Sequence, residues 1–303
     1  MSENEWLAAR FEEHRPHLRA VAYRMLGSLP DADDAVQDAW LRLSRAGTDE
    51  VENLGGWLTT IVARVCLNML RARTRRREDS FELHLPDPII SADGEPQPED
   101  EALLADSVGL ALLVVLDTLS PAERLAFVLH DLFDMPFERI AAMVDRTPAA
   151  ARQLASRARR RVRGADIQEP DPDLARQREV VDAFFLAARG GDFDGLVALL
   201  DPDVVLRGDL GATRRPATRV VRGAAAVAGQ ALIGAFPAAR LHPALVNGAA
   251  GAVITVHGRP FAVMGFTVAG GKIVEIDAIV DPERVRRIAA AVLADDAFTN
   301  DEP

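Results

Sequence analysis

The sequence predicts a multidomain protein in which two all-α helical domains precede an α+β domain. Apolar residues recur at helical spacing from Trp6 to Arg77 and again from about Leu103 to Arg163. The later stretch AVITVHGRPFAVMGFTVAGGKIVEIDAIV instead combines β-branched residues with glycine turns, which indicates antiparallel strands. A chain of 303 residues is also too long for one ordinary hydrophobic core. We therefore expect helical domains at 1–80 and 108–165, a linker at 81–107, a hinge at 166–174 and an α+β domain at 175–295.

Composition restricts the class of protein. Hydrophobic residues make up 49% of the chain, as is typical of globular proteins. The start of the chain mixes charges of both signs, and nowhere do about eighteen apolar residues run together, so we expect a cytoplasmic protein with no membrane partner. Cys66 is the single cysteine, which excludes an intrachain disulfide and a cysteine-based zinc cluster. We expect Cys66 in the core, and neither a metal nor a cofactor.

The segment PDADDAVQDAWLRLSRA predicts an amphipathic helix. Its apolar face carries Val36, Ala39, Trp40 and Leu43. The opposite face combines acids, an amide and a leucine, namely Asp34, Gln37, Asp38 and Leu41. These residues fit a surface that docks a partner, and on their own they fit an ordinary solvated face equally well.

The next predicted helix, in GGWLTTIVARVCLNMLRARTRRRED, is basic. Its core side consists of Ile61, Val62, Val65 and Met69. An exposed stripe contains Arg64, Asn68, Arg71 and Arg75. A basic helix that follows a glycine turn and Trp57 can hold an unpaired nucleic-acid strand, with the backbone on arginines and a base in a pocket. The alternative is a helix whose arginines only stabilise its C-terminal end.

The segment between the two helical regions, LHLPDPIISADGEPQPEDEALLAD, contains four prolines. From Asp87 to Asp106 it carries seven acidic residues and no basic one. Proline and uniform charge both oppose packing, so the segment predicts an exposed linker.

A helix-turn-helix is predicted by PFERIAAMVDRTPAAARQLASRARRRVR. Apolar spacing gives the buried side as Ile140, Ala141 and Val144 in the first helix and Ala151, Leu154, Ala155, Ala158 and Val162 in the second. Between them, Thr147 is a natural N-cap and Pro148 suits the first helical position. Asp145 stands where a glycine is usual in such a turn, and aspartate tolerates the left-handed conformation.

The second of these helices has the chemistry of a DNA reader. Residues 146–164 hold seven arginines and no acid, in a chain of formal net charge −11. The side chains expected on its exposed side are Thr147, Arg152, Gln153, Ser156, Arg157 and Arg160. Arginine can bond a guanine edge through two donors, which gives about 1–3 kcal/mol of discrimination per good contact. A solvated basic face is the alternative.

Three segments, in this order, resemble extracytoplasmic-function sigma factors of bacterial RNA polymerase: PDADDAVQDAWLRL, GGWLTTIVARVCLNMLRARTRRRE and LSPAERLAFVLHDLFDMPFERIAAMVDRTPAAARQLASRARRRVR. The first two are similar to sigma region 2 and the third to region 4, and together they cover about the first 165 residues.

The resemblance implies roles for these surfaces. The RNA polymerase core would be bound through its β′ clamp helices and β flap, the former by Asp34, Gln37, Asp38 and Leu41. The −10 promoter element would be melted and read by Trp57, Arg64, Asn68, Arg71 and Arg75. The −35 element would be read by Thr147, Arg152, Gln153, Ser156, Arg157 and Arg160. The acidic linker would lie along the RNA path of the polymerase and mimic a nucleic acid there, and a plain solvated linker stays open.

The rest of the chain resembles a SnoaL-like domain, the cone-shaped α+β fold of the nuclear-transport-factor-2-like superfamily. REVVDAFFLAARGGDFDGLVALLDPDVVLRGD, VVRGAAAVAGQAL and the strand run carry this resemblance. A sub-group of the sigma factors has such a domain, and its characteristic segments appear here in altered form as LHLPDP, RGDLGATRRP and DPERVRRI. The resemblance implies a regulatory domain that acts in cis, with an apolar pocket that senses a small molecule or docks on the sigma core.

Enzymes of that superfamily use a carboxylate base in an apolar cone. The candidates here are Asp203, Asp209 and Asp277, with His257 nearby in the strand run, although Asp203 reads as a turn residue. The single tyrosine lies outside this domain and supplies no phenolic donor. We expect a sigma factor and no enzyme. The alternatives are a ligand-responsive helix-turn-helix regulator and a SnoaL-type enzyme fused to a DNA-binding module.

Overall fold

The computed structural model describes most of the chain, in two compact units that are treated one by one below. The described residues are 3–46, 53–77, 85–92, 110–165, 167–211, 218–290 and 292–293. The first unit contains the described residues 3–77 and 112–167, and the second contains 85–92, 110–111 and 168–293. No helix in the described ranges is both long and apolar enough to span a bilayer.

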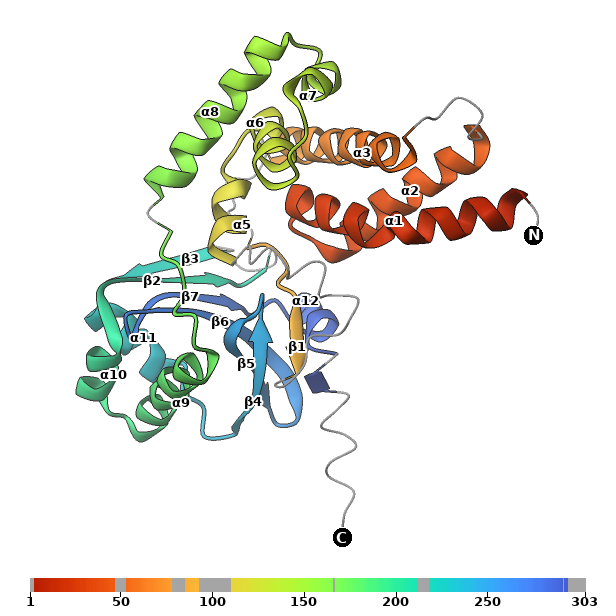
Figure 1. Cartoon of the computed structure of the whole chain (residues 1–303). Helices are drawn as coiled ribbons and strands as arrows, with labels where there is room; N and C mark the ends of the chain where they lie inside the picture. The colour runs from red at the N-terminus through yellow and green to blue at the C-terminus, as the bar shows by residue number, and fades with distance from the viewer. Residues whose placement is uncertain are drawn as a thin grey trace. The chain divides into compact units, whose positions relative to one another are not determined.

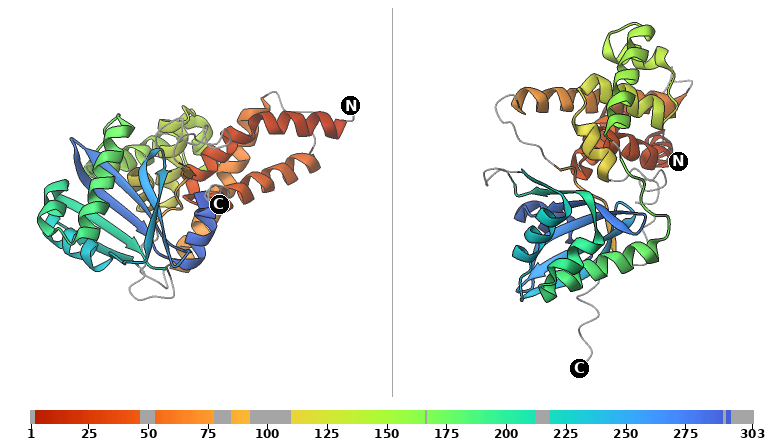
Figure 2. Two further views of the ribbon diagram at one scale, coloured as in Figure 1. Left: turned by 90° about the horizontal axis from the view of Figure 1, so that it is seen from below. Right: turned by 90° about the vertical axis from the view of Figure 1, so that its left-hand side faces the viewer.

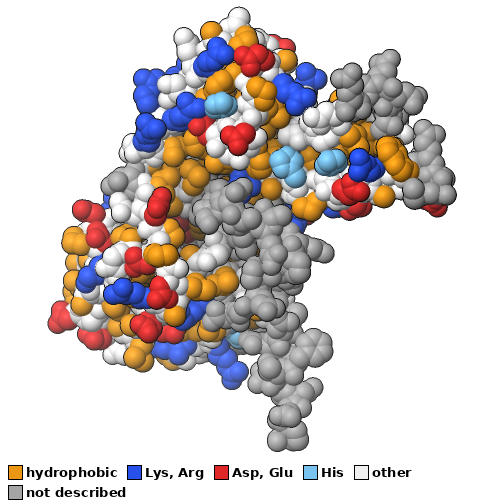
Figure 3. Space-filling view, in the orientation of Figure 1, with side chains coloured by type: hydrophobic (Ala, Val, Ile, Leu, Met, Phe, Trp, Pro, Cys, Tyr) orange, Lys and Arg blue, Asp and Glu red, His pale blue; other side chains and the backbone are white. Residues whose placement is uncertain are grey.

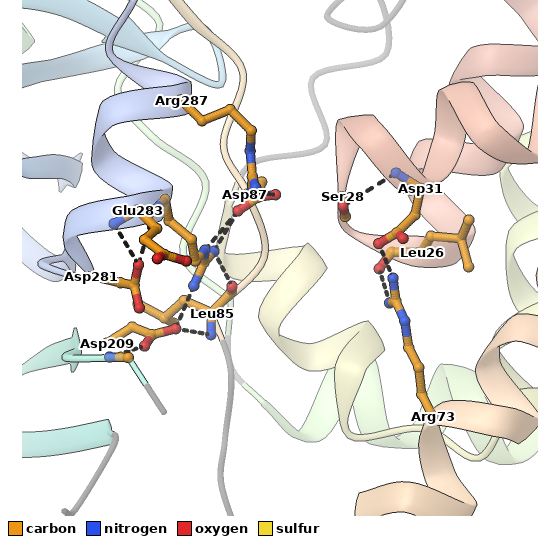
Figure 4. Close-up of polar contacts among 12 residues, drawn as sticks. Leu26, Ser28, Asp31, Arg73, Leu85, Asp87, Asp209, Asp281, Glu283 and Arg287 are labelled. Carbon is orange, nitrogen blue, oxygen red and sulfur yellow. Dashed lines mark hydrogen bonds and ion pairs between the residues drawn. The ribbon is translucent and has the colours of Figure 1, made fainter. Parts of the chain in front are cut away.

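The first unit begins with three helices that pack against one another (Figure 1). They are α1 (Glu3–Leu26), α2 (Leu29–Ala46) and α3 (Leu54–Arg77). Apolar side chains from all three, such as Val21, Leu43 and Leu67, are buried between them. Arg73 of α3 closes the turn between α1 and α2: its Nη1 donates to the Leu26 carbonyl at 2.8 Å, and its Nη2 pairs with Asp31 (Figure 4).

Shorter helices complete the first unit. They are α5 (Leu110–Asp117), of which residues 112–117 belong to this unit, α6 (Pro121–Phe127), the π-helix η1 (Val128–Leu132), α7 (Phe137–Val144) and α8 (Pro148–Gly164). Arg124 of α6 is 2% exposed and donates twice to the carbonyl of Arg24 in α1, at 3.2 Å. Its Nη1 also donates to Asp117 at 3.1 Å. Burial of a charge requires such partners, so these bonds hold α5, α6 and α1 in register.

The second unit is an α+β domain built on one seven-stranded sheet, which confirms the predicted fold class. The strand order is β1-β4-β5-β6-β7-β2-β3, and all pairings are antiparallel except that of β2 with β7. Its strands are β1 (Ile90–Ala92), β2 (Leu200–Asp209), β3 (Thr218–Arg222), β4 (Ala239–Val246), β5 (Ala249–Val256), β6 (Arg259–Ala269) and β7 (Lys272–Ile279).

Three two-residue turns join the strands from β4 to β7. They are Asn247–Gly248, His257–Gly258 and Gly270–Gly271, and both residues of each have positive φ. Positive φ at both central positions defines the type I′ turn, whose twist matches that of paired strands. The predicted glycine turns are therefore present, and the left-handed first positions of two of them are taken by asparagine and histidine.

Helices cover one face of this sheet (Figures 1 and 2). They are α9 (Leu174–Gly190), α10 (Phe193–Leu199) and α11 (Ala224–Ile233), while α12 (Pro282–Ile288) follows the last strand. Val181 and Phe184 of α9, Leu196 of α10 and Val227 of α11 pack with the sheet residue Phe266 in one buried core. Asp173, Asp192 and Asp281 cap the starts of α9, α10 and α12.

The prediction of an exposed linker is wrong for residues 85–92. Leu85 to Ser91 are all buried, and residues 90–92 form β1, which pairs with β4 at the edge of the sheet. The proline and acid content suggested solvation, but Leu85, Ile89 and Ile90 supply apolar surface that the second unit covers. The rest of the predicted linker, residues 81–84 and 93–107, lies outside the described residues.

Candidate nucleic-acid interface and linker clamp

The turn between α7 and α8 has the expected helix-turn-helix geometry. Asp145 adopts the left-handed conformation, with φ 54° and ψ 50°, and ends α7. Thr147 caps α8, because its Oγ1 accepts from the backbone N–H of Ala150 at 3.2 Å, and Pro148 occupies the first turn. All three expectations about this turn, for Asp145, Thr147 and Pro148, are confirmed.

Helix α8 separates its side chains as predicted. Ala151, Ala155 and Ala158 are fully buried, and Leu154 and Val162 are half-buried. The predicted DNA-reading residues are all exposed: Thr147, Arg152, Gln153, Ser156, Arg157 and Arg160. Figure 3 shows arginine side chains gathered over α8. The burial pattern therefore leaves a continuous polar and basic face, and its role in reading DNA stays a prediction.

Some arginines of α8 are already bound to acids within the first unit. Arg157 and Arg161 both pair with Glu123 of α6, at 2.8 and 3.0 Å, and Arg159 pairs with Asp131 at 2.5 Å. Arg152 pairs with Glu138 at 3.1 Å and lies over the Phe137 ring. Among the described residues, no ion pair holds Arg160. Arg152 and Glu138 are both exposed, so this pair is weak and can be exchanged for a phosphate, whereas Glu123 is a buried partner.

Glu123 is a structural residue that the sequence interpretation missed. It is 6% exposed and completes a capping box with Ser120 at the start of α6. Burial alone would raise its pKa, but hydrogen bonds from Arg157 and Ser120 lower the pKa below its ordinary value. The signal was available, because Ser-x-x-Glu before an apolar run is typical of a capping box.

The face of α2 that was predicted to dock a partner is accessible. Asp34, Gln37 and Leu41 are exposed, and Asp38 is half-buried. Leu41 is one of the exposed large apolar side chains, at 41%. Asp38 pairs with Arg42 at 2.9 Å, one turn further along the helix. A single exposed leucine is normal on a protein surface, so the docking role of this face stays a prediction.

Helix α3 presents the predicted basic stripe. Arg64, Asn68, Arg71 and Arg75 are exposed, Trp57 is half-buried, and Val62 and Val65 face the core. Ile61 and Met69 are half-buried. Cys66 lies fully inside, where burial raises the pKa of its thiol to about 12, so it is a core side chain without thiolate reactivity.

A buried polar cluster holds the linker segment in the second unit (Figure 4). Arg284 of α12 is its centre: Nε donates to Asp87 at 2.8 Å, Nη1 to Asp209 at 2.5 Å and Nη2 to the Leu85 carbonyl at 2.7 Å. The Leu85 N–H donates to Asp209 at 3.1 Å, and Arg287 pairs with Asp87 at 2.9 Å. We call Leu85, Asp87, Asp209, Arg284 and Arg287 the linker clamp.

The clamp continues into the strand pairing. The Ile89 N–H donates to Oδ1 of Asn247 at 2.7 Å, and the Asn247 N–H donates to the Ile89 carbonyl at 2.8 Å. Asp87, Asp209 and Arg284 are all less than 10% exposed. Because Asp87 is bound by two arginines, it is not a free negative charge of the kind that the nucleic-acid-mimic interpretation requires.

A cavity of about 230 Å³ lies between the sheet and helices α9 and α11. Its lining is mainly apolar and includes Phe184, Phe185, Phe236, Phe261 and Met264. Neither an acid nor a histidine is among the described residues that line it. No group of three or more potential metal ligands occurs in the described part of the chain either.

The four candidate catalytic residues lie elsewhere in the second unit. Asp209 belongs to the linker clamp, and Asp277 pairs with Arg207 at 3.2 Å, where burial outweighs that arginine and raises the pKa of Asp277 to about 7. Asp203 is exposed within β2, where the pairing is irregular and its N–H donates to the Asp201 carboxylate at 2.9 Å, the hydrogen bond of an Asx turn. His257 is exposed in a hairpin turn.

Comparison with known proteins identifies relatives along nearly the whole chain. Residues 10–76 match the family model Sigma-70 region 2, and residues 109–162 match Sigma-70, region 4. The chain is 39% identical to the ECF RNA polymerase sigma factor SigJ of Mycobacterium tuberculosis over 291 residues, which are 91% of this chain and 92% of the relative. It is 34% identical to a probable ECF RNA polymerase sigma factor, SigI, of the same species, over 96% and 98%.

The fold agrees with that relationship. The crystal structure of the Mycobacterium tuberculosis extracytoplasmic function sigma factor SigJ superposes with a TM-score of 0.72 at 36% identity. The superposition covers 91% of this chain and 97% of that one, so it includes both helical regions and the α+β domain.

Proposed function

We propose that this chain, which belongs to the extracytoplasmic-function RNA polymerase sigma factors, directs promoter-specific initiation through four contacts and restrains itself through the linker clamp. In the cytoplasm, the face of α2 binds the β′ clamp helices of core polymerase, and the α5–α8 region binds the β flap. The stripe of α3 reads the −10 element of the promoter, and α8 reads the −35 element. The observation that carries the proposal is that every residue assigned to these contacts is solvent-accessible in part or in full on its helix.

The linker clamp supports restraint in cis. Residues 85–92 cannot lie along a path on the polymerase while they form β1 and bond to Arg284 and Asn247. Docking of the linker in the second unit and its insertion in the polymerase are therefore alternative states, and whatever stabilises one depopulates the other.

Two other functions receive less support. A regulator without polymerase docking does not account for the exposed face of α2 in a member of the sigma family. A SnoaL-type enzyme needs a base in its cavity, and Asp203, Asp209, Asp277 and His257 do not line it. We assign no catalytic role to the second unit.

Transcription in vitro with core polymerase tests the polymerase contact. Asp34→Asn combined with Gln37→Ala should lower promoter-dependent transcript and weaken binding to core polymerase. Glu13→Gln is the control, because it removes an exposed acid of α1 that pairs only with a neighbouring arginine. Unchanged binding of the double variant would reject the proposed role of this face.

The same assay tests restraint. Asn247→Gly removes the side-chain bond to the Ile89 amide and still accepts the left-handed conformation of this turn. It should raise the transcript level, because it frees the linker without touching the first unit. The control is Arg286→Gln, on the exposed side of α12. A transcript level that falls or stays equal would contradict restraint by the linker, while leaving the sigma function itself intact.

A further inference from the structure

The cavity of the second unit has the construction of a ligand site. Its rim includes Gly234 and Phe236, which are exposed, so the cavity is open to solvent at that end. A folded chain loses dispersion contacts around any space that it leaves unfilled, so an apolar cavity of about 230 Å³ is retained at the expense of stability. Retention of such a space is expected where an occupant restores the contacts.

The walls of the cavity are apolar, so the part of a ligand that fills it must be apolar too. Phe184 and Phe185 of α9 come from one side, and Phe236 and Phe261 meet edge to face with their ring centroids 5.3 Å apart. An apolar cavity of about 150 Å³ accommodates benzene, so one of this size suits about ten carbon atoms, as in a bicyclic ring.

The polar lining is small and carries only positive charge. Of the described residues around the cavity, three are polar or charged: Arg189, Arg219 and Gln230. Arg219 is exposed on β3, and none of the described acids pairs with it. Arg189 makes a long bond of 3.4 Å to the Ala239 carbonyl. Guanidinium groups beside an apolar wall bind carboxylates through charge-assisted hydrogen bonds.

We infer that the cavity binds a small amphiphilic acid, whose apolar body of about ten carbons fills the space between the phenylalanines and whose carboxylate meets Arg219 at the rim. Charge complementarity selects the acid over the neutral molecule of the same shape. The inference concerns the second unit alone and holds whether or not the linker restrains transcription.

Fluorescence titration of the full chain with two matched probes tests this inference. Naphthalene-2-carboxylate and 2-naphthol share the ten-carbon ring, and only the first is charged at pH 7. We expect one carboxylate to bind per chain, about tenfold more tightly than the naphthol, since a charge-assisted bond distinguishes them. Arg219→Gln should bring the carboxylate to the affinity of the naphthol and leave the naphthol unchanged.

Two kinds of variant locate the site. Arg222→Gln removes the same charge from the same strand three residues away, where the side chain does not line the cavity, and should change neither affinity. Ala262→Phe fills the cavity and should abolish binding of both probes. Ala231→Leu, on the more tolerant surface of α11, makes the same test if Ala262→Phe does not fold.

Three results of the titrations would overturn the inference, apart from a complete absence of binding. They are equal affinities of the two probes for the unaltered chain, equal effects of Arg219→Gln and Arg222→Gln, and binding that survives in a folded cavity-filled variant. Absence of any binding at millimolar probe would overturn it as well.

Discussion

The arginines of α8 and Arg284 of α12 differ in burial. The exposed arginines are available to bind another molecule, whereas the buried Arg284 holds parts of the fold together. On α8, Arg152, Arg157 and Arg161 are about half exposed, and the exposed partner of Arg152, Glu138, can be exchanged for another anion. Arg284 is only 8% exposed, and each of its three nitrogens has a partner inside the second unit. An exposed arginine pair adds little stability, whereas a buried arginine fixes the position of the chain segments that it joins.

Replacement of the buried Arg284 should lower the free energy of unfolding more than replacement of any exposed arginine. Arg284→Met keeps an apolar stem but leaves the carboxylates of Asp87 and Asp209 buried with fewer partners. Removal of one member of a buried ion cluster lowers the free energy of unfolding by about 3–5 kcal/mol. Urea unfolding followed by circular dichroism measures the loss. Arg286→Met, from the exposed side of the same helix, is the control, and an equal loss in both variants would contradict the clamp.

Replacement of an exposed arginine of α8 should weaken promoter binding and leave stability almost unchanged. Arg160→Gln should leave the free energy of unfolding within about 0.5 kcal/mol, as is usual for surface changes. Promoter binding by the assembled polymerase should weaken, and the slope of log affinity against log salt should decrease by about one, the effect of one lost phosphate contact. Salt titration of promoter binding measures both. Arg10→Gln on α1 is the control, and a slope that does not change would remove Arg160 from the phosphate contacts.

The sequence predicted α8 correctly because its interactions join neighbouring residues. It failed on the linker because the interactions that bury the linker join residues far apart in the sequence. Helical periodicity, the Thr147 cap and the left-handed Asp145 are properties of a few neighbouring residues. Asp87 finds its partner 197 residues away and Asp209 meets the same arginine 75 residues away, so nothing in LPDPIIS marks it as buried. Its prolines and acids are real signals of solvation, and tertiary packing overrides them.

Glu123 combines features of the exposed arginines of α8 and of the buried Arg284, since it is a buried acid that exposed arginines bind. Glu123→Gln removes the capping carboxylate and both pairs and should lower the free energy of unfolding at pH 7 by about 1 kcal/mol. The folded state lowers the pKa of this carboxylate, so its stabilisation is fully present above the unfolded value of about 4.5 and is lost as the pH falls through the lower folded value.

The difference between the unaltered chain and Glu123→Gln should therefore shrink as the pH falls below about 4.5. Urea unfolding at pH 7 and at successively lower pH measures it. Glu138→Gln is the control, because Glu138 is exposed and pairs only with Arg152 at the surface. A difference that is the same at every pH would show that Glu123 stabilises α6 by packing and not by its charge.

The smallest expected effect is on hydrogen exchange in the linker when a ligand occupies the cavity, because strand β2 contacts both. Leu206, Gly208 and Leu210 line the cavity, while the intervening Asp209 binds Arg284 and the Leu85 amide. An occupant that restrains this end of β2 should slow hydrogen exchange at the Leu85 and Ile89 amides by about fivefold, the lower end of measured couplings between sites. Exchange with and without naphthalene-2-carboxylate measures this, with the cavity-filled Ala231→Leu as the control. If saturating ligand leaves both amides unchanged, the two sides of β2 are uncoupled, and the cavity does not regulate the linker.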